Sequence, residues 1–470
     1  MNVKPENLKV GTLTYTGGGL LMLCFWLYLG DFAILMRERA ITPTVTELLL
    51  QHHTSPSTIV LLTNVLPSII ALFVIIPLAY RSDRHRGPKG RRIPYLLWST
   101  PLAALGLVML AFSPILGAQL HLLLGDVSPG VNQCFLILFA IAWTIFEVGG
   151  MLTLTLFPAL INDVVPKGVL GRFYGAFRIV GLASGFIFMY WLFKYTNTHS
   201  FEILIGLAVL FGVGFMLMCL KVKEGEYPPP EAVSGGLVAN SKHFIKDSFS
   251  LKYYWWIIGF IVLSTMCFAP FNAVTQLYSN SLEIPLETYG KCTAYAWLTS
   301  AAIAYFIGWM VDKIGVFRIS SIFLLLFASV ALGGYFYISD KNSFLTVYVL
   351  HTIFAGAYMT AAASLPMRLY PRLKFTQFAS AVGLVAIPVT ITYNSFSAWM
   401  LDFTNNNYRL TLIFASAFAF LGLILLLVVW RNYGRRPEAV RIADGEVPSP
   451  IAAGDHPSCP SPAAPSSRPS

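Results

Sequence analysis

Long hydrophobic stretches recur along the chain, with short polar segments between them. Each stretch is about as long as the 20 residues that an α-helix needs to cross the hydrocarbon core of a bilayer. The pattern predicts an all-α integral membrane protein with twelve transmembrane helices, near residues 18–50, 57–80, 94–117, 131–161, 171–194, 201–221, 254–278, 291–311, 319–339, 344–370, 376–400 and 409–430.

Two longer polar segments divide this pattern. The first contains the turn-forming sequence YPPP and separates six predicted spans from six, and the second is rich in Pro, Ser and Ala, as disordered tails are. The first hydrophobic stretch is too long for a signal peptide, so we expect it to be retained. The expected parts are an N-terminal six-helix half (1–220), a cytoplasmic linker (221–252), a C-terminal six-helix half (253–430) and a disordered cytoplasmic tail (431–470).

Composition and charge agree with a membrane location. Only 11% of the residues are charged, against about a quarter in soluble domains, so most of the surface is expected to face lipid. If both termini are cytoplasmic, 25 of the 32 Lys and Arg residues fall on the cytoplasmic side and four on the opposite face. This asymmetry is the positive-inside pattern of a multi-pass protein of the cytoplasmic (inner) membrane. It accounts for the net charge of +10 without a nucleic-acid partner.

Patterns of common enzyme sites do not occur in the sequence. It contains no GxSxG, HExxH, CxxC or GxxxxGK[ST], and the six cysteines have neither metal-site nor disulfide spacing. The glycines of GTLTYTGGGL follow no predicted strand, so we interpret them as the start of the first helix. We therefore expect no enzyme activity, no cofactor and no metal.

Charged loops occupy the same position in the two halves: RSDRHRGPKGRR at 81–92 and GWMVDKIGVFR at 308–318. Such a repeat is typical of transporters whose halves are related by an axis along the membrane normal. Each loop places an acid among basic residues, whereas topology alone requires only the basic ones. We expect a gate that bonds cytoplasmic helix ends in one state and releases them in another, although anchoring of topology is the alternative. The candidate gate residues are Asp83, Arg84, Arg91, Asp312, Lys313 and Arg318.

The second loop resembles the G-x-x-x-D-(R/K)-x-G loop of the major facilitator superfamily, with Gly308, Asp312, Lys313 and Gly315 in register. The first loop lacks the leading glycine and is longer, and its SDR, GRR and IPY resemble the glycoside-pentoside-hexuronide:cation symporter branch, the melibiose permease-like transporters. The resemblance covers both halves. It implies a secondary transporter with a site between them.

Charges inside predicted spans are concentrated in the first half. A charge at the bilayer centre costs at least about 2.5 kcal/mol, so it persists where it meets a partner or a water-filled cavity. The interiors of spans seven to twelve offer only His351. Ion coupling is therefore expected in spans one, four and five, which carry Asp31, Arg37, Glu38, Arg39, Glu147 and Arg178.

Span one contains GDFAILMRER, residues 30–39. If the helix is tilted and broken near Pro43, Asp31 and Glu38 lie near mid-depth on one face, where they would share a proton or hold a cation. Alternatively, the span ends at Met36 and residues 37–39 form a solvated helix end. Asp31 also resembles the acidic position in the first helix of melibiose-type permeases.

Spans four and five supply an expected ion pair. Glu147 lies near the middle of span four with Trp143 one turn earlier, and Arg178 lies at nearly matched depth in span five. The pair would neutralise itself while the guanidinium keeps donors for a substrate hydroxyl, or it would be a purely structural salt bridge. The layout resembles the sugar site of the symporter branch.

Span two departs from that branch, whose second helix carries acids for the cation. Here Asn64 is the only strong polar group in the span. A sodium site of that type is therefore disfavoured. A proton shared among Asp31, Glu38 and Glu147 is the expected coupling cation.

The second half offers amides and aromatic rings, which suit a polyhydroxylated ring with one apolar face. Asn272 and Gln276 lie four apart, with Pro270 able to kink the helix. The expected substrate-binding residues are Asp31, Trp143, Glu147, Arg178, Asn272, Gln276, Tyr358 and Asn394.

Together these features predict a monomeric secondary active transporter, embedded in the lipid bilayer, that moves a small-molecule substrate by alternating access. A sugar or glycoside coupled to a cation, with a proton favoured over sodium, is the leading expectation. The alternatives are a carrier of an amphipathic or lipid-like solute or drug, and a non-transporting membrane sensor on the same fold.

Overall fold

The computed structural model describes residues 9–10, 12–75, 78, 81–82, 85–225, 249, 252–370 and 375–433. Within these residues, twelve helical segments are long and apolar enough to cross a membrane. The predicted all-α fold with twelve spans is thus confirmed. A short hairpin precedes the first helix and was not expected. It pairs two strands of two residues each, β1 (Lys9–Val10) and β2 (Leu13–Thr14).

Several of the first six spans are built from helical pieces in series. Span one is α1 (Gly17–Gln51), span three is α5 (Ile93–Leu124), which ends in η4 (Gly125–Val127), and span four is α6 (Val131–Val164). Span two runs through α2 (Pro56–Val60), η2 (Leu61–Val65), α3 (Leu66–Ile70) and η3 (Ala71–Ile75). Span five is α7 (Lys167–Ile187), η5 (Phe188–Leu192) and η6 (Phe193–Tyr195). Span six is α8 (Ser200–Val209), η7 (Leu210–Phe215) and α9 (Met216–Lys221).

The last six spans begin with an interrupted helix, made of α11 (Lys252–Met266), α12 (Ala269–Asn272) and α13 (Thr275–Ser281). They continue with α14 (Leu286–Ile314), α15 (Val316–Tyr337), α16 (Lys341–Ala362), the short α17 (Leu365–Leu369), α18 (Phe375–Phe403) and α19 (Leu410–Tyr433). Most bounds match the prediction to within a few residues. Span three extends further than expected, and span ten is interrupted after Ala362.

Proline has different effects in two of these spans. The expected break near Pro43 is wrong, because α1 continues through it to Gln51. In span seven the helix does stop before Pro270, which sits in the first turn of α12, where its missing N–H breaks no helical bond. The interruption leaves Asn272 and Gln276 on two separate short helices. The sequence pattern had placed them on one.

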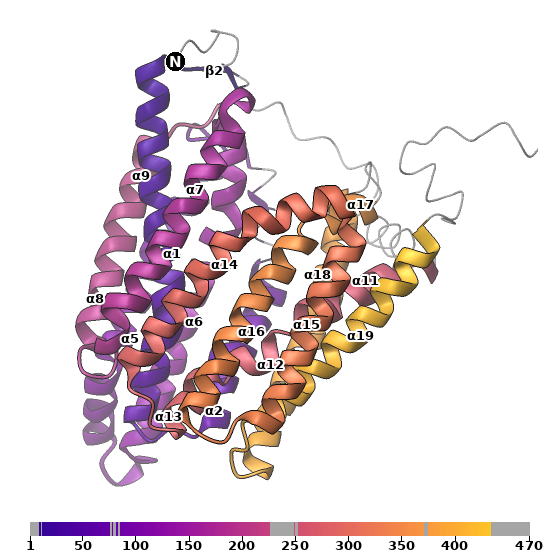
Figure 1. Cartoon of the computed structure of the whole chain (residues 1–470). Helices are drawn as coiled ribbons and strands as arrows, with labels where there is room; N and C mark the ends of the chain where they lie inside the picture. Colours follow the sequence, from indigo (N-terminus) through magenta and orange to yellow (C-terminus); the bar gives the residue numbers. More distant parts are fainter. Residues whose placement is uncertain are drawn as a thin grey trace, which may run out of the picture.

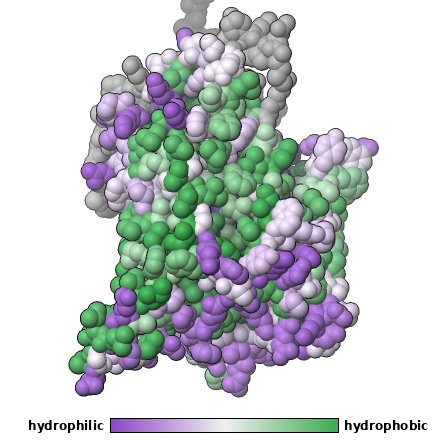
Figure 2. All heavy atoms as spheres, turned by 90° about the vertical axis from the view of Figure 1, so that its left-hand side faces the viewer, coloured by the Kyte–Doolittle hydropathy of each residue, from purple (hydrophilic) through white to green (hydrophobic). Residues whose placement is uncertain are grey.

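The outer surface is apolar across its middle, as a bilayer requires. In Figure 2 hydrophobic atoms cover the middle of the face formed by the first spans, and hydrophilic atoms gather at its lower end. Exposed large side chains in this part of the chain include Phe73, Leu105, Ile137, Val209 and Val213. We therefore expect these exposed side chains to contact lipid.

The first six and the last six spans contact each other mainly toward one end. Helix α14 contacts η5, η6 and α7, helix α18 contacts α2, η2 and α3, and α1 contacts α13. Figure 1 shows the helices of the two groups converging toward the bottom of the view and diverging toward the top, where α1 begins. We call the converging end, where α1 ends and α2 begins, the far end.

Close approach at the far end depends on Gly290 of α14. A Cβ built there would overlap the carbonyl oxygen of Met189 in η5 and would lie 2.9 Å from the Phe193 ring of η6. Real Cβ atoms essentially never approach other heavy atoms within 3.0 Å. The absence of a side chain at this one position therefore lets the two groups of spans meet.

Candidate functional site

A central cavity of about 890 Å³ lies between the two groups of spans. Its wall comes from α1, η2, α7 and η5 on one side and from α12, α13, α14 and α16 on the other. This volume is in the range of sites that enclose small organic molecules. A site shared in this way changes its exposure when the two groups move against each other.

Four of the residues predicted to bind the substrate or the coupling cation line this cavity: Glu38, Arg178, Asn272 and Gln276. Other polar residues of the lining include Arg39, Thr42, Asn64, Trp297, Ser300 and His351. Arg39 lies with its guanidinium 4.9 Å from the centre of the Trp297 ring, so a cation of α1 reaches an aromatic ring of α14 across the interface.

Glu147 and Arg178 do not form the expected ion pair in the described part of the chain. Arg178 lines the cavity, whereas the half-buried Glu147 on α6 interacts electrostatically with Arg37 and Glu38 of α1. The sequence placed both groups inside spans, as the structure does. It did not show which side of each helix faces which neighbour.

Arg37, and not Arg178, is the arginine whose charge acts on Glu147. Its side chain is 1% exposed, with Nη2 3.5 Å from the Gly150 carbonyl oxygen and 3.6 Å from the Glu38 carboxylate. The guanidinium also lies over the rings of Phe146 and Phe211, at 5.4 and 4.6 Å. A buried arginine thus stands next to a cavity-lining acid, and the alternative of a solvated helix end at 37–39 is wrong.

Four predicted substrate-binding residues are buried elsewhere. Asp31 is 1% exposed and lies outside the cavity lining, so it does not share a cavity face with Glu38. Trp143 packs between the rings of Phe139 and Phe146. The remaining two also lie outside the cavity lining: Tyr358, which packs against Phe268, and Asn394, which is 3% exposed on α18.

The far end of the cavity is held by Glu47, a residue that sequence reasoning missed. Its Oε1 accepts hydrogen bonds from Nε2 of Gln276 and Nδ2 of Asn280, both at 2.7 Å. Gln276 also donates to the Pro43 carbonyl oxygen at 3.0 Å. The sequence signal that points to Glu47 is the single acid within PTVTELLL in span one. Together, these four residues form a polar latch between α1 and α13.

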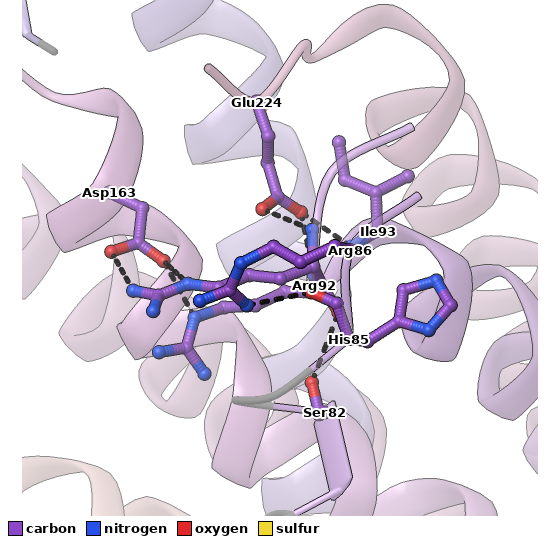
Figure 3. A network of polar contacts seen from close by, with 8 residues as sticks. Ser82, His85, Arg86, Arg92, Ile93, Asp163 and Glu224 are labelled. Carbon is purple, nitrogen blue, oxygen red and sulfur yellow. Dashed lines mark hydrogen bonds and ion pairs between the residues drawn. The ribbon is translucent and has the colours of Figure 1, made fainter. Parts of the chain in front are cut away.

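At the end where α1 begins, Asp163 and Glu224 organise the start of α5 (Figure 3). The Asp163 carboxylate accepts two bonds from Arg91, at 2.7 and 3.1 Å, and one from Arg92 at 2.7 Å. Glu224 accepts the backbone N–H groups of Arg91, Arg92 and Ile93, at 2.9, 2.8 and 2.6 Å. The linker after span six and the end of α6 are thereby tied to the same helix N-terminus.

The candidate gate residues have different environments. Arg91 binds Asp163, while Asp83 and Arg84 lie outside the described residues. In the second loop Lys313 lies 4.7 Å from the Trp309 ring centre, and among described residues no ion pair joins Asp312 to Lys313 or Arg318. The gating role of the second loop remains a prediction.

We expect Asp163→Asn to weaken the network in which Asp163 binds Arg91 and Arg92. The amide retains one acceptor oxygen but turns an N–H₂ toward two partly buried guanidinium groups, so the free energy of unfolding should fall by about 1.5–3 kcal/mol. Thermal and denaturant unfolding of the purified protein would measure the loss. Asp126→Asn, at an exposed aspartate of η4, is the control. An equal loss in both variants would contradict the structural role of Asp163.

The sequence model described as Major Facilitator Superfamily matches residues 21–372. No curated protein matches the sequence. The fold is similar to that of a bacterial homologue of the iron transporter ferroportin in its inward-facing state (TM-score 0.61, 15% identity, 87% of this chain and 99% of that one).

Two further solved structures have the same fold. One is a D-xylose-proton symporter (TM-score 0.62, 16% identity, 88% of this chain and 98% of that one). The other is the xylose transporter XylE from E. coli in an inward-open conformation (TM-score 0.59, 17% identity, 88% and 96%). At such low identity these similarities establish the shared fold alone.

Proposed function

Because the chain belongs to the Major Facilitator Superfamily and is a membrane transporter, we propose that it moves a small polar solute, of the sugar or glycoside class, by alternating access. The two halves, 1–220 and 253–430, would rock about the central cavity. The melibiose permease-like branch remains part of this proposal, on the SDR and GRR of the first loop.

The central cavity is the observation that carries the proposal. Residues of both groups of spans line the cavity, and the lining contains amides, hydroxyls and an indole ring from several helices. Such groups suit a hydroxylated ring. The latch of Glu47 with Gln276 and Asn280 closes one end, which supports an inward-facing state if the termini are cytoplasmic. The surplus of Lys and Arg near the end where α1 begins supports that orientation in a cytoplasmic membrane.

Proton coupling is the second part of the proposal. Glu38 lines the cavity, Arg37 lies behind it, and Glu147 interacts with both. Taken by themselves, the two carboxylates and the guanidinium of Arg37 are charge-balanced when one carboxylate carries a proton. Span two offers Asn64 but no acid to the cavity, so we favour a proton over sodium.

Flux measurements with the full chain in proteoliposomes would test the function. We expect a pH gradient, acidic on the side that the far end faces, to concentrate a hydroxylated solute inside the vesicles, with acidification of the lumen. Efflux of an amphipathic dye in place of this would favour a carrier of lipid-like solutes. No flux of any solute, with the protein folded, would favour a non-transporting sensor.

A further inference from the structure

The charges that line the central cavity are unequal in number. Its charged residues are Glu38, Arg39 and Arg178. Glu38 lies 3.6 Å from the guanidinium of Arg37, which is buried behind it. Among the described residues, Arg39 and Arg178 have no carboxylate partner. The cavity therefore presents two arginines whose charge the protein does not neutralise.

Arg39 is held by contact with an aromatic ring, whereas a buried arginine is usually held by a carboxylate. Its guanidinium lies 4.9 Å from the centre of the Trp297 ring. Gly185 of α7 makes room for this pair, since a Cβ there would lie 2.9 Å from the Trp297 ring and 3.6 Å from Cγ of Arg39. An arginine stacked on a ring face keeps its in-plane N–H donors. Those donors remain available to a ligand.

The part of the cavity lining that the other half contributes includes an exposed amide and a buried imidazole, neither with a charged partner among the described residues. Asn272 is exposed to the cavity from α12. His351 of α16 lies between the rings of Phe271 and Phe327, at 4.9 and 4.8 Å, and is 1% exposed. Neither of its ring nitrogens has a hydrogen-bond partner in the described part of the chain. A ligand in the cavity would thus meet cations on one wall and polar donors and acceptors on the other.

Alternating access requires the loaded cavity to close. In the open cavity, water solvates the two arginines, but closure removes that water, and an arginine without a counter-charge is then strongly disfavoured. A guanidinium is best matched by a planar or tetrahedral oxyanion, which it binds with paired N–H donors. The missing negative charge must therefore come from the solute, if the protein is the transporter proposed above.

We infer that the transported solute is an organic anion, whose carboxylate or phosphate lies against Arg39 and Arg178 while its hydroxyls face Asn272 and His351. This inference rests on the proposed transport function and narrows its substrate class. Among hydroxylated compounds it selects a sugar acid or a sugar phosphate over a neutral sugar.

Thermal unfolding of the purified full chain with matched probes tests the charge. Glucuronate and glucuronamide differ by one charge at nearly equal size, and glucose 6-phosphate and glucose form a second pair. We expect at least one anion to raise the unfolding temperature with an apparent affinity about tenfold or more above that of its neutral partner. The pair that responds distinguishes a carboxylate from a phosphate. Equal effects within both pairs, or no effect of either anion, would overturn the inference.

Variants locate the effect at the arginines. Arg178→Gln and Arg39→Gln should each weaken binding of the effective anion by about tenfold or more, with the weak binding of its neutral partner unchanged. Arg178→Lys should lie between, because the charge remains and the paired donors are lost. Lys341→Gln, at an exposed cation of the far end, is the control. Unchanged anion binding in both glutamine variants would overturn the site.

Flux in proteoliposomes separates this inference from the transport proposal. Uptake of glucose without uptake of glucuronate or glucose 6-phosphate would leave the transport function standing and reject the anion. Anion binding that depends on Arg178, with no flux of any probe, would support the anion site and reject transport.

Discussion

Replacing Glu147 by glutamine is expected to lower transport driven by a pH gradient by about tenfold or more, while exchange of solute without a gradient falls only a few fold. The amide keeps the size of the side chain but binds and releases no proton. Coupling needs a group that does both in each access state. Solute counterflow and gradient-driven uptake, measured on the same proteoliposomes, would give the two rates.

Arg37, whose charge acts on Glu147, provides a second measurement, which is the stability of the variants. In Glu147→Gln, Arg37 keeps the Glu38 carboxylate at 3.6 Å but loses the nearby charge of Glu147, so the variant should lose stability, though less than the several kcal/mol of a fully unpaired buried charge. Adding Arg37→Gln should restore folding more than flux. Arg178→Gln on the same background should not restore folding, because Arg178 faces the cavity.

Glu202→Gln, at an exposed acid near the start of α8, is the control for the loss of a carboxylate. Unchanged gradient-driven uptake in Glu147→Gln would remove Glu147 as the coupling acid. The same amide substitution would then be made at Glu38 and Asp31, singly and together. A triple amide variant that still concentrates solute against a proton gradient would reject proton coupling altogether.

A valine at Gly290 is expected to prevent the far end from closing. Its side chain has no space between the Met189 carbonyl and the Phe193 ring, so α14 must move away from η5 and η6. Overpacking of this kind costs about 1–3 kcal/mol, which shifts an equilibrium between two access states by about 5–150-fold. Transport should fall accordingly, because one of the two states becomes rare.

Labelling of a cysteine at Thr46 would report this shift. Thr46 lines the cavity near the latch and is 5% exposed. A membrane-impermeant thiol reagent applied from the side of the far end should label Thr46→Cys slowly in the parent and faster in the Gly290→Val background. Gly333→Val on α15 is a matched control, since a Cβ at Gly333 meets nothing within 4 Å. Equal labelling in all three backgrounds would reject the role of Gly290.

The fold was largely predictable from the sequence, and the site only in part. Hydrophobic length determines the number of spans, and Pro270 predicts the interruption of span seven, because both effects are local along the chain. Glu38, Arg178, Asn272 and Gln276 line the cavity, as expected for residues chosen by polarity and depth.

What the sequence did not contain is the rotation of each helix about its axis. Trp143 and Tyr358 are aromatic residues at a suitable depth, yet each points into the packing of its own half. Arg37 and Arg39 are two positions apart on α1, so they face different directions, and the buried one is Arg37. These orientations follow from contacts between distant segments, which no local pattern encodes.

The unequal distribution of charge between the two groups of spans has an electrical consequence. Interior charged residues such as Arg37, Glu38, Glu147 and Arg178 all belong to the first six spans, while the described charges of the last six lie toward helix ends. A membrane potential does work of about 2.3 kcal/mol per 100 mV on each charge that crosses the whole field. If the two halves rock as proposed, the voltage acts on that motion through α1, α6 and α7 of the first six spans, and the last six spans move through the field as nearly neutral material.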